Sequence, residues 1–294
     1  MRKGHRTGAS DPSPPVRRPA VAGTFYPSSP ETLKEVIDSC FTHALGPGSK
    51  PPAHPRDSKM VAVLAPHAGY EYSGPVAAHS YLHVSSLPDP DLLVVVAPNH
   101  YGIGSGVATY REGYWETPLG RLRVDSQASK ALVEAGVASF DHDAHRLEHS
   151  LEVQLPFLQS IYGDSVPLLP ISLLFQDPET SEAVAGVLVE ILRGRKAVLV
   201  ASSDLTHYEP AEVAQAKDLP LLDRVTKMDV EGFYSTLERL QVTACGYGAI
   251  ATVMRTASSL GLRHGELLKY ATSGDITGDN LQVVGYGSAR FVSQ

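Results

Sequence analysis

The sequence predicts an α/β fold, in which a single domain has a central, mainly parallel or mixed sheet flanked by helices on both faces. Two observations carry this prediction. Three short apolar runs, Val61–Ala65, Leu92–Ala97 and Ala197–Ala201, have the length and the aliphatic character of buried strands. Stretches of helical periodicity separate these runs. Strands that alternate with helices form sheets with both faces covered.

The composition is that of a soluble globular protein. Of the 294 residues, 43% are hydrophobic and 19% are charged, which excludes extensive disorder and collagen-like fibres. With 32 acidic and 25 basic residues the net charge is -7, so neither nucleic acid nor an anionic membrane surface is an expected partner. No run approaches the roughly 18 apolar residues of a membrane-spanning helix. The two cysteines, Cys40 and Cys245, are too few for a disulfide scaffold, which favours a reducing cytoplasm.

Residues 1–19 are predicted to form a disordered basic tail, and residues 20–294 one folded domain. The tail carries five arginine or lysine residues among Ser, Pro and Gly, and it lacks the apolar core of a secretory signal. The first predicted helix runs from about residue 30 to residue 43. Ser29 is its expected N-cap and Pro30 its first residue. Cys40 lies inside this helix and is assigned to packing.

The other predicted elements follow in chain order. Helical periodicity recurs in six stretches: Gly74–Val84, Gln127–Ala135, Glu148–Tyr162, Glu179–Arg193, Val213–Met228 and Ile250–Leu260. The segment Trp115–Val124 is predicted to be a β-hairpin and Gln282–Val292 the last strand. Val166–Leu173 is a further strand, and Pro167 and Pro170 favour an edge position for it because proline cannot donate to a ladder.

Polar residues follow each of the three apolar runs. The first run leads into His67, the second into His100, and the third into Asp204 and His207. In an open α/β sheet, ligands bind beyond the carboxyl ends of the strands. We therefore expect these four side chains to meet at one edge of the sheet.

A second polar cluster begins the helix predicted from Glu148. His149 and Glu152 are three residues apart and would share one face of this helix, where they either line a site or belong to a solvated acidic first turn. Solvation is the favoured interpretation for Glu148. Asp204 and His207 would meet if the chain makes a helical turn, and a carboxylate that fixes an imidazole tautomer serves a general base and a metal site alike. The alternative is that Asp204 caps a helix.

Cys245 precedes the helical stretch that begins at Ile250. A thiol at a helix N-terminus is drawn toward the thiolate, whereas most free cysteines are inert buried thiols, and both interpretations stay open. A hydrolase is not favoured. Ser203 with His207 and Asp204 could mimic a catalytic triad, but the chain has no G-x-S-x-G motif. It also has neither a phosphate-binding G-x-x-x-x-G-K-[ST] loop nor a G-x-G-x-x-G motif after a strand.

The ordered set of motifs resembles the Memo family, known in prokaryotes as AmmeMemoRadiSam system protein B and related in fold to the class III extradiol (LigB-type) dioxygenases. The resemblance extends from about residue 19 to residue 291. Its markers are Ala22-Gly23-Thr24-Phe25-Tyr26, Ala65-Pro66-His67-Ala68-Gly69-Tyr70, Pro98-Asn99-His100, Thr117-Pro118-Leu119, Glu148-His149-Ser150-Leu151-Glu152, Ser202-Ser203-Asp204-Leu205-Thr206-His207 and Cys245-Gly246. Each motif is short, and the set in this order is specific.

The resemblance implies a metal site in which His67, His100 and Cys245 are the ligands. His149, Asp204 and His207 would line the same pocket as catalytic residues, with His207 as the acid/base group. Two imidazoles and a third anionic ligand suit iron(II), the expected metal, while a thiolate also suits copper and zinc. Because the thiolate stands where the dioxygenase relatives have a carboxylate, ring cleavage is not carried over.

The implied function is metal-dependent redox or oxygen chemistry on a small-molecule or peptide ligand in the metal pocket. The prokaryotic family name further implies action beside a radical-SAM enzyme and an Amme-domain protein. The alternative is a non-enzymatic module that binds a peptide or a protein and retains the dioxygenase-like pocket, because a shared fold does not transfer chemistry.

Overall fold

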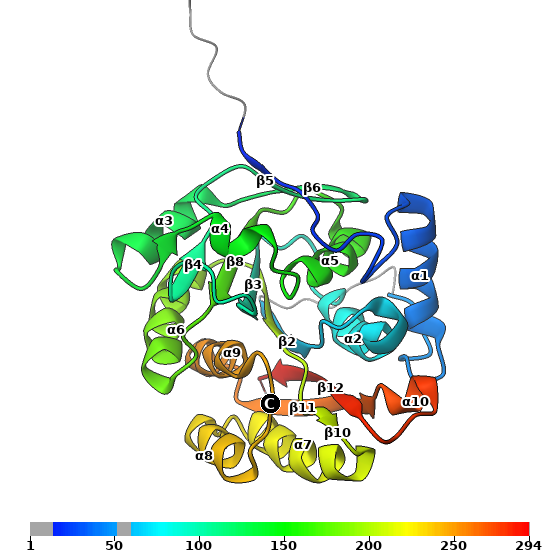
Figure 1. The fold of residues 1–294 in the computed structure, drawn as a ribbon. Helices are drawn as coiled ribbons and strands as arrows, with labels where there is room; N and C mark the ends of the chain where they lie inside the picture. The colour runs from blue at the N-terminus through cyan, green and yellow to red at the C-terminus, as the bar shows by residue number, and fades with distance from the viewer. Residues whose placement is uncertain (1–13, 52–59, 294) are drawn as a thin grey trace, which may run out of the picture.

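The computed structural model describes residues 14–51 and 60–293, and four parallel strands form the centre of its main sheet (Figure 1). In spatial order they are β2 (Met60–Ala65), β9 (Ala197–Ser202), β3 (Leu92–Pro98) and β8 (Leu168–Leu173). Their residues are buried almost without exception, as expected for strands covered on both faces. The three apolar runs are therefore neighbouring strands.

Antiparallel strands extend this centre on both sides, so the sheet is mixed. On the side of β2 lie β12 (Val283–Val292), β10 (His207–Glu209) and β11 (His264–Thr272). On the side of β8 lie β4 (Val107–Thr109) and β7 (Ser139–Phe140). A separate small sheet contains β1 (Val16–Arg17) and the predicted hairpin, formed by β5 (Tyr114–Thr117) and β6 (Gly120–Arg123).

Helices cover both faces of the main sheet (Figure 1). Alternate side chains of a strand point to opposite faces, so Val61 and Val63 belong to one core and Ala62 and Leu64 to the other. The first core includes α1 (Pro30–Thr42), α2 (Tyr70–Val84) and α5 (Leu155–Tyr162). The second includes α3 (Ser126–Glu134), α6 (Pro178–Leu192), α7 (Ala211–Thr226), α8 (Val230–Leu240) and α9 (Tyr247–Ser259).

The predicted fold class is confirmed as one α/β fold with a mixed sheet between two helical layers, consistent with the class III extradiol dioxygenase-like arrangement. Ser29 is the N-cap of α1, where its side chain accepts the backbone N–H of Thr32. Three short helices, α4 (Asp143–Arg146), η1 (Glu152–Gln154) and α10 (Gly274–Thr277), complete the described elements. Among the described helices none combines the length and the apolar character needed to cross a membrane.

The predicted edge position of the strand with two prolines is wrong. Strand β8 lies between β3 and β4, with β7 beyond them. The short length of β4 makes this position compatible with Pro170, because the β4 ladder ends where Thr109 pairs with Ile171. Pro170 is the next residue outward, and its carbonyl accepts the Thr109 hydroxyl. The missing N–H therefore removes no bond from that ladder.

The helix predicted from Glu148 begins later. Residues 147–151 belong to no helix or strand, the single 3₁₀ turn η1 follows, and α5 starts at Leu155 with Pro156 in its first turn. Proline is well tolerated there, since the first N–H groups of a helix have no partner within the helix. Glu148 and His149 consequently lie in a loop rather than on a helix face.

The folded domain begins closer to the N-terminus than the predicted boundary at residue 20. Residues 14–19, assigned to the tail by sequence, are described, and within them Val16–Arg17 pairs with β5. The Arg17 residue is 4% exposed. The prediction of disorder for residues 1–13 lies outside the described residues.

Candidate metal centre

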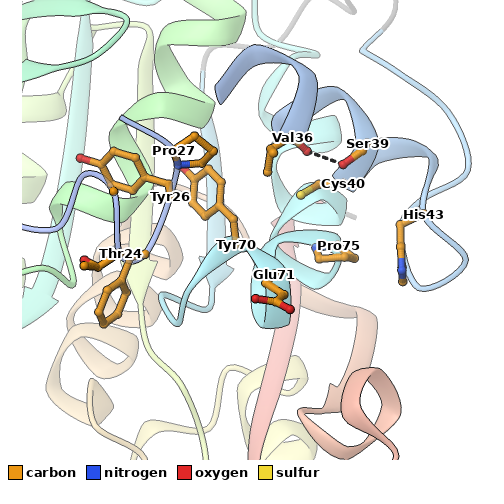
Figure 2. Close-up of a pocket in the computed structure, with 12 residues that line it drawn as sticks. Thr24, Tyr26, Pro27, Val36, Ser39, Cys40, His43, Tyr70, Glu71 and Pro75 are labelled. Carbon is orange, nitrogen blue, oxygen red and sulfur yellow. Dashed lines mark hydrogen bonds between the residues drawn. The ribbon is translucent and has the colours of Figure 1, made fainter. Parts of the chain in front are cut away.

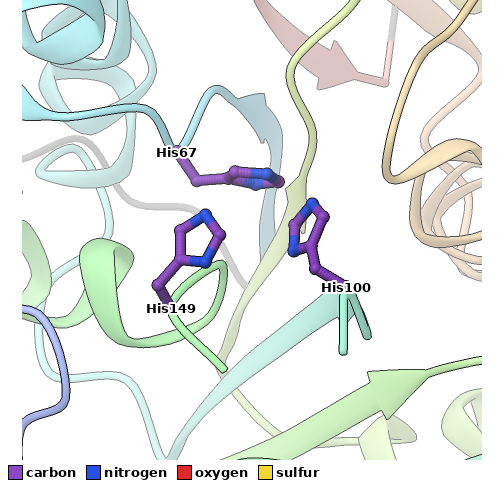
Figure 3. A group of neighbouring side chains, drawn as sticks. All are labelled: His67, His100 and His149. Atoms are coloured by element: carbon purple, nitrogen blue, oxygen red, sulfur yellow. The ribbon is translucent and has the colours of Figure 1, made fainter. Parts of the chain in front are cut away.

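The carboxyl ends of the parallel strands bring the predicted site residues together. His67 follows β2, His100 follows β3, and Asp204 follows β9, as expected for ligand sites of open α/β sheets. His149 joins them from the turn between α4 and η1. Figure 3 shows the rings of His67, His100 and His149 facing one another, with potential ligand atoms that all lie within 4.8 Å of each other.

Hydrogen bonds set the tautomer of His67. Its Nδ1 lies 2.8 Å from the hydroxyl of Ser202, which donates its only hydrogen to the carbonyl of Ser150. The same hydroxyl accepts an N–H of Gln154, whose amide oxygen accepts the Tyr81 hydroxyl. Ser202 can therefore only accept from His67, so Nδ1 carries the proton and the Nε2 lone pair is available. Burial, together with the nearby imidazoles, lowers the pKa of His67 well below its usual value and keeps it neutral.

Glu148 orients His100. Its carboxylate accepts both the Nδ1–H (2.9 Å) and the backbone N–H (2.6 Å) of His100, and also the backbone N–H of Ser150. The expectation that Glu148 is solvated is wrong, because the residue is 1% exposed. Burial opposes both charges, but the contact between the two residues raises the pKa of His100 and lowers that of Glu148 to about 2. A carboxylate behind the imidazole leaves Nε2 free for a metal.

His149 lies against the other two imidazoles. Its ring stacks on that of His100 with centroids 4.8 Å apart, and its Nδ1 is 3.5 Å from the Glu148 carboxylate. Burial lowers the pKa of His149 to about 4 although this carboxylate acts in the opposite direction. The imidazole is therefore neutral at pH 7. Glu152, which was expected to share a face with His149, instead forms a buried ion pair with Arg17.

Cys245 contacts His67. The Sγ atom lies 3.1 Å from Nε2 of His67 and accepts the backbone N–H of Asp204 at 3.2 Å. This approach depends on Gly246, where a Cβ atom would lie 2.2 Å from the carbonyl oxygen of Ser202. Burial, and next the Asp204 carboxylate, raise the pKa of the Cys245 thiol. The protein alone thus holds a neutral thiol, and the role of Cys245 as a metal ligand stays a prediction.

Asp204 and His207 do not form the predicted pair. No helical turn follows β9, and an Asp204 oxygen accepts the backbone N–H of His67 at 2.8 Å, which fixes the turn that carries this histidine. His207 begins β10, and its Nδ1 lies 3.0 Å from the carbonyl of Thr243. A carbonyl can only accept, so Nδ1 carries the proton and Nε2 can take one up. Desolvation raises the pKa of the buried Asp204 carboxyl.

The donor set fits a metal ion. The imidazoles of His67 and His100 each have Nδ1 engaged by a hydrogen bond from behind, which leaves Nε2 to face an ion, and this is the usual arrangement around metal-binding histidines. His149 is the residue whose ring nitrogen lies within 4.8 Å of the ligand atoms of both His67 and His100, whereas the contact of Cys245 is with Nε2 of His67. Sequence reasoning missed the supporting residues Ser202 and Gln154, because nothing in the sequence indicates which distant partner a polar side chain will meet.

The cavity of about 470 Å³ between α1 and α2 is not part of this centre (Figure 2). Cys40, Tyr26 and Tyr70 line it together with Phe25. Cys40 is 3% exposed, and burial raises the pKa of its thiol to about 12, which agrees with the packing role predicted from the sequence. Phe25 also contacts the centre, with its ring centroid 4.6 Å from that of His149.

Comparison with known proteins shows which family the chain belongs to. The family described as Memo-like protein matches residues 17–290. A MEMO1 family protein of Methanopyrus kandleri is 46% identical over 94% of this chain and 98% of its own length. One of Nitrosopumilus maritimus is 45% identical over 94% of this chain and its full length, and one of Methanothermobacter thermautotrophicus is 45% identical over 92% and 98%. With such matches along nearly its whole length, the chain belongs to the Memo family.

Proposed function

We propose that this protein is a metal-dependent redox protein that holds one iron or copper ion at His67 and His100 and acts with dioxygen on a small-molecule or peptide ligand. The observation that carries the proposal is the pair of imidazoles whose Nδ1 atoms are engaged by Ser202 and Glu148, which leaves both Nε2 atoms for an ion. The bound ion would supply redox and Lewis-acid chemistry. His149 or Cys245 would complete the ligand set.

The chain's own residues would position the ligand and move protons beside the ion. His207 is held by Thr243 so that its Nε2 can accept or donate a proton at the reacting ligand. Asp204 fixes the backbone of His67 and places a buried carboxyl 4.0 Å from Nε2 of this residue. The acid/base role of His207 is the one that the family resemblance implies, whereas the support of His67 by Asp204 follows from the hydrogen bond between them.

A thiol nucleophile is less well supported, although Cys245 and His67 are in contact. Such a nucleophile needs a thiolate beside an imidazolium. Here burial raises the pKa of Cys245 and lowers that of His67, so the pair stays neutral. Ser203 is also engaged, because its hydroxyl donates to the carbonyl of Asp204 and accepts the N–H of Gly246.

Oxygen uptake by metal-loaded protein tests the proposal. Protein purified anaerobically is loaded with ferrous or cuprous ion, freed of excess metal and mixed with air-saturated buffer and ascorbate. We expect faster uptake than with metal-free protein, and a decrease of at least about tenfold in His207→Ala, since a positioned acid/base contributes on the order of a hundredfold. Loaded protein without uptake would contradict redox chemistry, and failure to bind either ion would favour the peptide- or protein-binding alternative.

Metal affinity should fall as the pH is lowered, first through His100. Glu148 raises the pKa of His100, so a proton competes with the metal there at a higher pH than at His67 or His149. Once His100 is protonated, the affinity should drop about tenfold per pH unit. In Glu148→Gln this drop should begin at a lower pH, while the affinity at pH 8 falls about 10- to 100-fold because His100 loses its orienting carboxylate. Titration with a metal between pH 5 and pH 8 measures both effects. An unchanged pH profile in Glu148→Gln would contradict the assignment.

A further inference from the structure

The segment before the first long helix binds the loop that carries His149. Arg17 donates from Nε to the carbonyl of His145 at 3.0 Å and from Nη2 to the carbonyl of Glu148 at 2.6 Å. Its remaining nitrogen pairs with the carboxylate of Glu152. The guanidinium group therefore contacts the loop on both sides of His149.

Glu152, the partner of Arg17, also binds the backbone of the segment that contains Arg17. Its carboxylate accepts the backbone N–H groups of Ala20 at 2.8 Å and Val21 at 3.1 Å, and also the hydroxyl of Tyr26. Glu152 is fully buried, and with Arg17 it has four donors. Such a carboxylate has no freedom to turn toward the metal ligands, so its function is to hold the backbone.

Two ring contacts complete the attachment. The Arg17 guanidinium lies over the ring of Trp115, 4.6 Å from its centroid, and Trp115 is fully buried. Phe25, at the end of the segment, packs against the ring of His149. Residues 17–26 thus contact the loop through its backbone and contact His149 directly through a side chain.

We infer that Arg17 is a positioning residue of the metal centre, which fixes residues 145–152, from the end of α4 to the start of η1, and thereby the imidazole of His149. This inference rests on the proposed function. Residues 147–151, between α4 and η1, belong to no helix or strand, and the carbonyl of His149 accepts the backbone N–H of Val153 at 2.9 Å. The contacts of Arg17 add anchors at the carbonyls of His145 and Glu148, which precede His149. A metal site requires its ligands to be held within about 0.5 Å, and residues behind the ligands provide this rigidity.

The test compares Arg17→Lys with Arg18→Lys, using cobalt(II) as the probe. Lysine keeps the charge but cannot reproduce the planar fork that reaches three acceptors. Arg18 is the neighbouring residue and is exposed, so it provides a matched control. For Arg17→Lys we expect cobalt(II) affinity to fall about 10- to 100-fold. We also expect the visible spectrum of cobalt(II) bound to Arg17→Lys to resemble that of cobalt(II) bound to His149→Ala. Arg18→Lys should bind cobalt(II) with the affinity and the spectrum of the wild type.

Three readouts separate the explanations. A lower thermal midpoint of Arg17→Lys with unchanged cobalt(II) affinity and spectrum would show that Arg17 only stabilises the fold, and would overturn the inference. Absence of a cobalt(II) spectrum in the wild type would instead contradict the metal site itself. If Arg17→Lys does not fold, Glu152→Gln replaces it, because it keeps the shape of the side chain and weakens the contact with Arg17. It is judged by the same affinity and spectrum.

Discussion

In His67→Ala, the metal content should fall from about one ion per chain to less than about a tenth of an ion, because removal of a central ligand destroys the site. His67 has a fixed tautomer and lies against the other candidate ligands: its ring centroid is 5.3 Å from that of His100 and 5.5 Å from that of His149. Cys245 touches its Nε2 atom. Elemental analysis of anaerobically purified protein measures the content.

The same measurement identifies the third ligand. The family resemblance predicts Cys245, whereas His149 is the residue whose ring nitrogen lies within 4.8 Å of the ligand atoms of His67 and His100. Loss of the metal in Cys245→Ser but not in His149→Ala would favour the thiolate, and the converse would favour a three-histidine site. His264 is exposed at the start of β11, so His264→Ala is the control that should keep its metal. A metal content that persists in His67→Ala would contradict the site.

The sequence predicted the layers and the location of the site because both depend on local patterns. The strands β2, β3 and β9 coincide with continuous aliphatic runs, and the position of the residues that follow each run is determined by the strand itself. The positions of His67 and His100 at one edge of the sheet could therefore be predicted without information on contacts between distant parts of the chain. The position of β8 was predicted wrongly, because it depends on where the short partner strand β4 ends. The presence of Pro170 in the sequence does not indicate the length of that partner.

Glu148 and Arg17 were predicted to lie at the surface, and these two errors have a different cause. Glu148 and Arg17 are charged, and charged residues are usually solvated, so a local interpretation places them at the surface. In the structure each is buried by partners far away in the chain: Glu148 meets His100, and Arg17 meets Glu152 across 135 positions. Only the fold brings such partners together. The acidic cluster of the sequence thus supports the candidate site: Glu148 holds the imidazole of His100, and Glu152 holds the segment that contains Arg17, Ala20 and Val21.

Among substitutions in the loops around the site, replacement of Glu152 should cause the largest decrease in the free energy of unfolding. In Glu152→Ala the Arg17 cation stays buried without a counter-charge, and the backbone N–H groups of Ala20 and Val21 lose their acceptor. Breaking one side of a buried ion pair costs about 3–5 kcal/mol of unfolding free energy. Urea unfolding of the metal-free protein measures this loss. Glu231→Ala is the control, because Glu231 is exposed in its ion pair with Arg255 and such pairs contribute about 0–1 kcal/mol.

The double variant Arg17→Met/Glu152→Ala distinguishes the contribution of this ion pair to folding stability from its contribution to positioning His149. It removes the buried charge together with its partner, so it should be more stable than Glu152→Ala alone. Methionine, however, cannot donate to the carbonyls of His145 and Glu148, and the loop that carries His149 loses two of its anchors. Stability should therefore recover in part while cobalt(II) affinity remains low. If affinity recovered together with stability, the pair would serve folding alone, because the position of His149 would then follow from the packing of the core.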